Sequence, residues 1–153
     1  MEKTKEKRNE SDKLSINIIA MFTYVGFAIS LVFPSLRFTC WFIPIIMYFI
    51  NYSKKAVRFH SCQAFILGVI ANTLNSLVTL IITNLVLVQF YNPFDWAGYA
   101  KMNSYLLISN IVISVIFLLI LIVPFIKLSK NERYAIPIIG NLAGTLDKSI
   151  HKG

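Results

Sequence analysis

Lys54-Lys55-Ala56-Val57-Arg58-Phe59-His60-Ser61-Cys62-Gln63-Ala64-Phe65 is a short polar and basic stretch with strongly apolar sequence on both sides. A membrane-spanning helix needs roughly 20 apolar residues to cross about 30 Å of hydrocarbon, and apolar runs of this kind flank the stretch. The pattern predicts that the stretch is a hinge at a membrane surface, where two helical hairpins meet.

The composition is typical of a membrane domain rather than of a soluble one. Of the 153 residues, 56% are hydrophobic and only 14% are charged. A soluble domain of this size must cover its surface with charged groups, and this chain has few of them. The net charge of +8 does not indicate nucleic-acid binding, because the basic residues flank the apolar runs and no nucleic-acid-binding motif is present.

Four apolar runs follow a mixed-charge tail at residues 1–14, which we expect to be solvated and mobile. We expect the membrane domain at 15–128, with transmembrane helices at about 15–33, 38–51, 62–90 and 103–126. The second run is only about 14 residues long and contains Pro44. It would cross by thinning the bilayer or by leaning on its neighbours, or else form a re-entrant hairpin. The predicted fold is all-α, with four transmembrane helices in two hairpins.

The distribution of Lys and Arg predicts the orientation. With four spans, the tail, the hinge and the C-terminal segment share one side and hold every Lys and Arg except Arg37 and Lys101. Cytoplasmic segments beside membrane helices carry an excess of these residues, so both termini are expected in the cytoplasm. Cys40 and Cys62 would then face opposite sides, which argues against a disulfide between them.

The C-terminal segment, 129–153, is predicted to form an amphipathic helix that lies in the membrane interface. From Tyr134 to Ile150 the apolar residues recur at helical spacing, and the polar residues fall on the other face. Pro137 is tolerated in the first turn of such a helix. The predicted apolar face consists of Ala135, Ile139, Leu142, Leu146 and Ile150.

Uncharged polar residues line one face of the third and of the fourth apolar run. Asn72, Asn75 and Thr79 fall within an arc of about 100° on the third helix, and Asn103 and Asn110 share a side of the fourth. Amides in hydrocarbon are costly unless they are paired, so the two faces should turn toward each other or toward water. Either these residues hold the helices together, or they line a polar groove that accommodates a segment of another protein.

The sequence does not indicate an enzyme. No cluster of His, Cys, Asp and Glu has the spacing of a metal site, and no catalytic triad or phosphate-binding glycine loop is present, so we expect no cofactor. Arg58, His60 and Gln63 cluster where the basic hinge meets the headgroups. They are candidate contacts for lipid phosphates or for a partner protein.

Two segments of the chain resemble a known family. The strings Val57-Arg58-Phe59-His60 and Gln63-Ala64, and the closing segment from Tyr134 to Ala143 with its Pro137 and Gly140, are similar to motifs of the Tic-twenty-like membrane proteins. The resemblance covers about Tyr24 to Ala143 and implies a four-helix membrane protein with both termini on one side. Plastid members belong to the protein-import machinery of the inner envelope, and most bacterial relatives have no assigned role.

Two departures from the plastid pattern favour a prokaryotic relative in the plasma membrane over a plastid one in the inner envelope. His60 stands where plastid members more often have asparagine, and no acidic residue follows Gln63 in the stretch up to Gly68.

Three functions remain open at this point. The first is a component or accessory of a protein-translocation assembly, whose partners are the lipid bilayer, translocating polypeptides and other membrane proteins. The second is an accessory or immunity-type protein that binds a lipid or a membrane-active peptide through its basic face, which includes Lys54, Lys55 and Arg58. The third is a small transporter, which at this size would act as a homo-oligomer.

Overall fold

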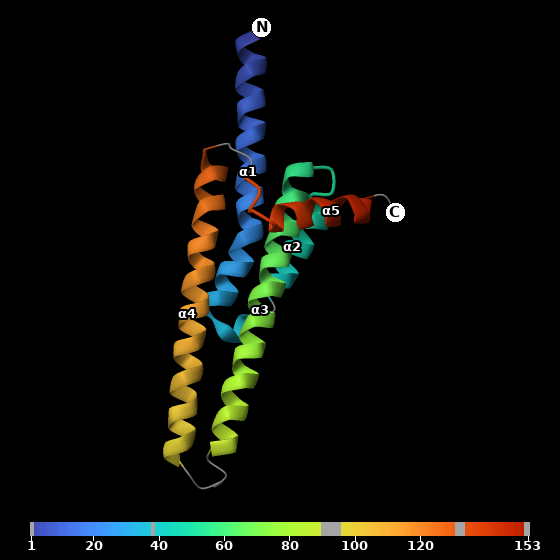
Figure 1. The fold of residues 1–153 in the computed structure, drawn as a ribbon. Coiled ribbons are helices and arrows are strands. Elements are labelled where there is room, and N and C mark those ends of the chain that lie inside the picture. The colour runs from blue at the N-terminus through green and yellow to red at the C-terminus, as the bar shows by residue number, and fades with distance from the viewer. Residues whose placement is uncertain (1, 38, 90–95, 131–133, 152–153) are drawn as a thin grey trace.

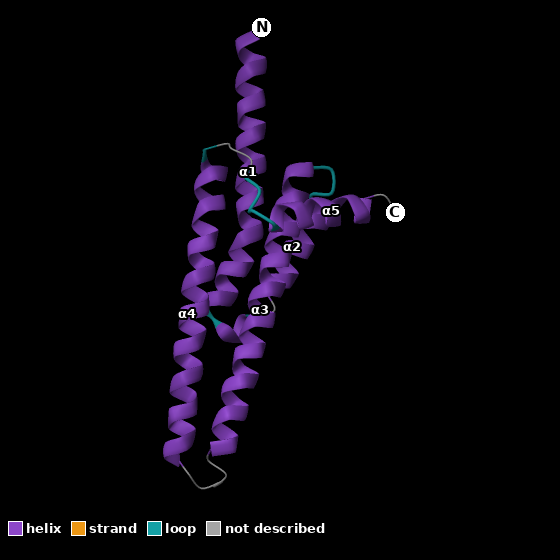
Figure 2. Ribbon diagram, in the orientation of Figure 1, coloured by secondary structure: helices purple, strands orange, loops and turns teal. Residues whose placement is uncertain are grey.

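The structure is a computed structural model that describes residues 2–37, 39–89, 96–130 and 134–151 (Figure 1). Every regular element within these ranges is helical, and they contain no strand (Figure 2). The elements are α1 (Glu2–Val32), a single 3-10 turn (Pro34–Leu36), α2 (Thr39–Ile50), α3 (Lys55–Gln89), α4 (Trp96–Ser129) and α5 (Ile139–His151).

Three helices are long and apolar enough to cross a membrane, in the segments Leu14–Val32, Lys55–Leu85 and Trp96–Ser129. Four spans were expected, and the second run differs from that expectation. Its helix α2 has 12 residues, which is about 18 Å and falls short of the roughly 30 Å of a hydrocarbon core. The chain turns directly after it, where the Lys54 N–H donates to the Asn51 carbonyl at 2.8 Å.

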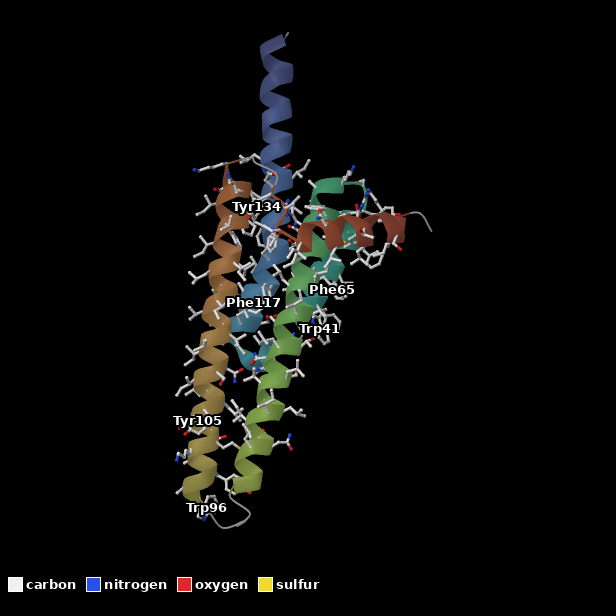
Figure 3. All side chains as sticks on the ribbon, in the orientation of Figure 1. Trp41, Phe65, Trp96, Tyr105, Phe117 and Tyr134 are labelled. Atoms are coloured by element: carbon white, nitrogen blue, oxygen red, sulfur yellow. The ribbon has the colours of Figure 1, made fainter. Side chains whose placement is uncertain are left out.

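The helices form two antiparallel hairpins of unequal length. In Figure 1 the turn between α1 and α2 lies about halfway along α3 and α4, whose remaining halves continue beyond it. Arg37, directly after the 3-10 turn, donates from Nη2 to Asn110 Oδ1 at 2.9 Å, and Asn110 lies near the middle of α4. Trp96 and Tyr105 lie on the part of α4 that extends past the first hairpin (Figure 3).

Glycines let α2 pack closely against both neighbours. A Cβ at Gly26 of α1 would lie 2.6 Å from the Thr39 carbonyl oxygen, and one at Gly68 of α3 would lie 3.0 Å from the Cys40 carbonyl oxygen. Aromatic side chains fill the space between α1 and α4, where the rings of Phe27 and Phe117 meet edge to face at 5.8 Å. The α1–α2 hairpin therefore packs against one half of the α3–α4 hairpin, the half that contains the start of α3 and the end of α4.

Several helices begin earlier than the sequence indicated. The expected hinge was Lys54–Phe65, but α3 begins at Lys55 and only the turn at 51–54 separates it from α2. The helix α1 begins at Glu2 and so continues through the charged tail, and α4 begins at Trp96 rather than near 103. The hinge motif therefore occupies the first turns of a long helix, where its side chains take fixed positions.

The C-terminal helix begins later than expected, and small residues face α3. The helix α5 begins at Ile139, because Ile138 has a positive φ of 67° and the Ile139 N–H donates to the Pro137 carbonyl in a tight turn. Its buried residues Gly140, Ala143 and Asp147 face α3, while Leu142 and Ile150 of the predicted apolar face are exposed. Small residues allow the close helix contact, which leaves the larger aliphatic residues outside.

Candidate functional site

A buried ion pair joins three helices at the N-terminal end of α3. Arg58 Nε donates to Asp147 Oδ1 at 2.9 Å, and the two side chains are only 7% and 9% exposed. Tyr48 of α2 donates its hydroxyl to the same carboxylate oxygen at 3.2 Å. The guanidinium of Arg58 also donates to the Tyr52 carbonyl and lies over the Tyr52 ring, with its carbon 5.3 Å from the ring centroid. The ion pair therefore fixes α5 and the end of α2 to α3.

A second buried polar group joins α1 to α3 one turn further along. The Tyr24 hydroxyl donates to Gln63 Oε1 at 2.8 Å and lies 3.0 Å from His60 Nδ1. A phenol has one proton to donate, so with that proton on Gln63 the bond to His60 requires a proton on Nδ1. Gln63 Nε2 has no hydrogen-bond partner among the described residues, and a Cβ at Gly140 would lie 3.0 Å from it.

The three candidate headgroup contacts therefore lie inside the protein. Arg58, His60 and Gln63 are 6%, 1% and 0% exposed, and each is bonded to another part of the chain. Sequence reasoning missed their partners. Asp147 is the only acidic residue of α5, and Tyr24 is a phenol within an apolar run, so each residue type called for a polar partner.

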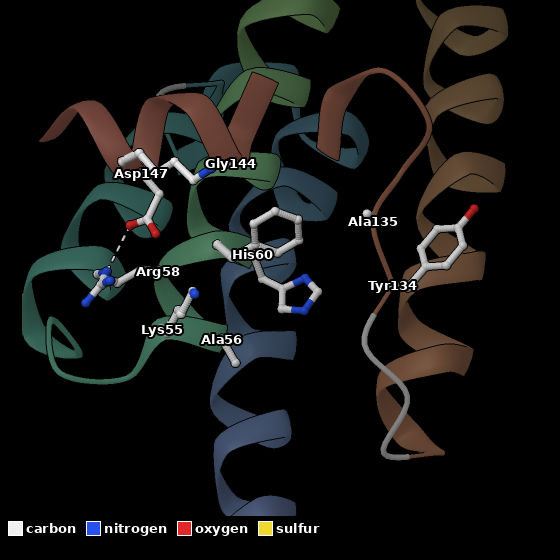
Figure 4. Close-up of a pocket in the computed structure, with 10 residues that line it drawn as sticks. Lys55, Ala56, Arg58, His60, Tyr134, Ala135, Gly144 and Asp147 are labelled. Carbon is white, nitrogen blue, oxygen red and sulfur yellow. Dashed lines mark hydrogen bonds and ion pairs between the residues drawn. The ribbon is translucent and has the colours of Figure 1, made fainter. Parts of the chain in front are cut away.

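A cavity of about 710 Å³ opens beside this cluster, between the start of α3, α5 and the segment that precedes α5 (Figure 4). Tyr134 and Ala135 lie across it from Ala56 and His60. Lys55 and Lys148 are exposed at its edge, whereas the basic group of Arg58 is already paired with Asp147. The remaining lining residues are Phe59 and Gly144. The cavity thus combines an apolar wall with two exposed lysine side chains.

Two further cavities lie end to end along α3, below the turn of the α1–α2 hairpin. Their volumes are about 590 and 350 Å³, and they share Arg37, Ser76 and Leu80. We call this pair of cavities the α3 groove. The other lining residues are Trp41, Asn72, Thr73, Leu77, Thr79, Thr83 and Asn84. Hydroxyl and amide side chains thus lie along one face of α3 for about three turns. Arg37 is the one cation among the described residues that line the groove.

The structure separates the polar residues of the third run into two groups. Asn72 and Thr79 both line the α3 groove, and Asn72 also donates to Cys40 Sγ of α2 at 2.9 Å. Asn75 is buried at 8% exposure and does not line either cavity.

The polar residues of the fourth run do not line the groove. Asn103 is exposed on α4, and Asn110 is bonded to Arg37 and to the Leu106 carbonyl. The groove thus forms between α3 and the turn of the first hairpin, and not between α3 and α4. Sequence reasoning missed Arg37 because the residue was assigned to a loop outside the membrane.

No protein-family model, curated protein or solved structure matches this chain.

Proposed function

We propose that the protein is a small, non-enzymatic integral membrane protein with four embedded helices in two hairpins. Its three long apolar helices support this proposal, because their exposed faces carry Leu, Ile and Val along most of their length. In this proposal α1 and the short α2 turn back inside the bilayer before its far surface, so that only α3 and α4 cross it fully. The helix α5 lies in the interface with Leu142 and Ile150 toward lipid. Both termini lie in the cytoplasm, on the side that is rich in Lys and Arg.

We also propose that the protein is a Tic-twenty-like protein, in a prokaryotic plasma membrane. The two motifs that carry the resemblance lie far apart in the chain, yet they pack against each other. Gln63 of the first motif approaches Gly140 of the second, and both motifs line the cavity of about 710 Å³. Two segments that build one packed unit constrain each other's sequence, which is a physical reason for them to occur together.

Its proposed role is to shelter a segment of another polypeptide within a protein-translocation assembly. The observation that carries this proposal is the α3 groove, because hydroxyl and amide groups of α3 line it beside Arg37 and Trp41 of the first hairpin. A polypeptide segment that crosses hydrocarbon needs hydrogen-bond partners for its polar groups, and each unpaired group costs several kcal/mol. The groove supplies such partners on one side while leaving the other side open to lipid.

Photocrosslinking in cells tests this role. A photoreactive residue at Ser76, which is exposed and lines both cavities, should capture a range of membrane or secreted proteins. The matched control is Ile81, which is 55% exposed on α3 and lines neither cavity. Equal capture from both positions, or capture of copies of this chain alone, would contradict the proposed role.

A second candidate function is binding of an anionic amphiphile at the cavity of about 710 Å³. Lys55 and Lys148 favour it, because they lie beside an apolar wall and are not engaged by the buried ion pair. The variant Lys55→Gln with Lys148→Gln should lose most crosslinking to a photoreactive phosphatidylglycerol in vesicles, whereas Lys101→Gln should retain it. Unchanged crosslinking in the double variant would remove this candidate.

A further inference from the structure

Arg37 stands at a depth where a charged side chain is unusual. It contacts Asn110 near the middle of α4, and from Ser76 at its side α3 continues to Gln89, which is about 20 Å of helix. The exposed residues on this part of α3 include Leu77, Leu80, Ile81 and Leu85. Lipid is the solvent that such a surface suits, so within the proposed membrane protein Arg37 lies inside the hydrocarbon region and not at its edge.

A guanidinium at this depth is stabilised by an anionic partner. Arg37 has five N–H donors, and the bond to the neutral amide of Asn110 uses one of them. Among the described residues that line the α3 groove, none carries a carboxylate. Ionisable residues within membranes are expensive and usually mark a pathway or a binding site. The charge is therefore uncompensated by the residues that line the groove.

We propose that Arg37 is an intramembrane receptor for a carboxylate, carried by a membrane-spanning polypeptide segment that lies in the α3 groove. This proposal rests on the proposed function and names its client class: segments with an Asp or Glu within an otherwise apolar stretch. Arg binds a carboxylate with two parallel hydrogen bonds, which gives both energy and orientation.

The lining of the groove favours a polypeptide over a lipid headgroup as the source of the anion. Headgroup phosphates stay at the bilayer surface, whereas Arg37 lies beside about 20 Å of exposed apolar helix on the loop side of α3. Beyond Arg37 the groove presents Ser76, Thr79 and Thr83, which are neutral groups suited to the amides of a polypeptide. A phosphate would favour a second cation, but Arg37 is the one basic residue among the described residues that line the groove.

The test uses the full-length protein in vesicles of phosphatidylcholine, with a photoreactive residue at Ser76. The probes are two synthetic transmembrane peptides of Leu and Ala that differ only in one central residue, Asp in one and Asn in the other. The Asp peptide should crosslink about tenfold more efficiently than the Asn peptide, since a hydrogen bond to a charged group is stronger than one to a neutral group. Arg37→Gln should reduce the crosslinking of the Asp peptide to that of the Asn peptide.

A second variant keeps the test valid if Arg37→Gln does not fold. Asn110→Asp has nearly the same shape and places a carboxylate beside the guanidinium, so it should also abolish the preference for the Asp peptide. Lys101→Gln removes a distant positive charge on the exposed surface of α4 and should leave the preference unchanged.

Each outcome separates this proposal from the proposed function. Equal crosslinking of both peptides from Ser76, with little from Ile81, would overturn the carboxylate receptor and leave the groove in place. No crosslinking of either peptide above the Ile81 level would contradict the groove itself. If, in vesicles that also contain phosphatidylglycerol, Ser76 instead captured this anionic lipid in an Arg37-dependent way and the peptides did not compete, the occupant would be a lipid, and the proposal would be overturned.

Discussion

Arg58 and Asp147 form a buried ion pair that holds the helices together at the end of the molecule where α3 begins. Each side chain is less than a tenth exposed, and each needs the other because an unpaired charge in such surroundings is costly. The pair also fixes the C-terminal helix, since Asp147 is the residue of α5 that bonds both α2 and α3. The same two residues close one wall of the cavity of about 710 Å³.

Removing one partner of this ion pair should destabilise the protein strongly. Asp147→Asn keeps the shape of the side chain but leaves the Arg58 charge buried, and such changes cost roughly 3–5 kcal/mol. Unfolding by graded SDS in mixed micelles measures the loss. Lys148→Gln, at the exposed neighbouring position, should have little effect. The double variant Arg58→Met with Asp147→Leu should recover part of the loss, and a wild-type stability of Asp147→Asn would refute the role of the pair.

Ile138 adopts a backbone conformation that a β-branched residue rarely takes. Its φ is 67°, its side chain is 78% exposed, and it directly precedes α5. The left-handed region costs a residue with a Cβ roughly 1–2 kcal/mol, so Ile138→Gly should stabilise the protein slightly. Leu142→Gly is the contrast, because it places glycine inside α5 and should cost about 1 kcal/mol. Thermal unfolding in one detergent compares them; destabilisation by Ile138→Gly would contradict the expected turn geometry.

Among the helices, close contacts at glycine determine where the short hairpin sits. The turn after α1 places Arg37 at the head of the α3 groove only because α2 packs against Gly26 on one side and Gly68 on the other. The positions of Arg37, Trp41 and Ser76, which line the groove together, therefore depend on these two close contacts. At the first of them the Thr39 hydroxyl also donates to the Gly26 carbonyl at 2.8 Å.

Replacing these glycines by alanine should separate tight contacts from open ones. Gly26→Ala brings a methyl group to 2.6 Å from backbone oxygen and should cost about 1–3 kcal/mol, while Gly68→Ala, at 3.0 Å, should cost less. Gly144→Ala is the control, because its nearest neighbour is Phe59 at 3.9 Å, and alanine favours the helix. The free energy of unfolding in mixed micelles ranks the three. A Gly26→Ala protein as stable as Gly144→Ala would contradict the packing.

The helical character of the chain was predictable from the sequence, but the lengths of its helices were not. Apolar runs near 15–33 and 103–126 indicated helices, and three of the four expected runs lie in helices long enough to span. The extent of α3 back to Lys55 was missed because a basic stretch was taken as a hinge, whereas Arg58 pairs internally with Asp147. That pairing is a tertiary contact between distant residues, and local periodicity does not contain it.

The candidate site was predictable in its residue types and not in its geometry. The polar stripe that includes Asn72 and Thr79 was visible in the spacing, and both residues line the α3 groove. The expected partner face on α4 was not found there, because Asn110 is taken up by Arg37. Arg37 itself follows Pro34 in a turn, which suggested a loop at the surface. Only the unequal depth of the two hairpins places that turn beside the middle of α4.

At the scale of the whole molecule, the unequal hairpins make the two ends of the structure different. At the end near Lys55, α5 packs across α3 and forms the buried ion pair with it, whereas the described chain at the end near Trp96 consists of α3 and α4 alone (Figure 1). The groove lies where four helices give way to two. A protein that shelters a polypeptide segment within a membrane needs such a step, because a complete bundle would cover the polar face of α3 with its own helices.

Cysteine labelling tests whether the first hairpin stops inside the membrane. Ser35→Cys lies at the turn after α1, Ser53→Cys in the turn before α3, and Lys101→Cys near the start of α4, all at exposed positions. In sealed vesicles of one orientation, a membrane-impermeant maleimide should label Ser53→Cys from one side and Lys101→Cys from the other. It should label Ser35→Cys from neither side, because the 12 residues of α2 give about 18 Å of helix.

The wild type should remain unlabelled, since Cys40 and Cys62 are buried, and all three variants should react once SDS unfolds them. Labelling of Ser35→Cys from the same side as Lys101→Cys would show that α2 crosses the membrane fully, and it would remove the depth on which the proposed role of Arg37 depends.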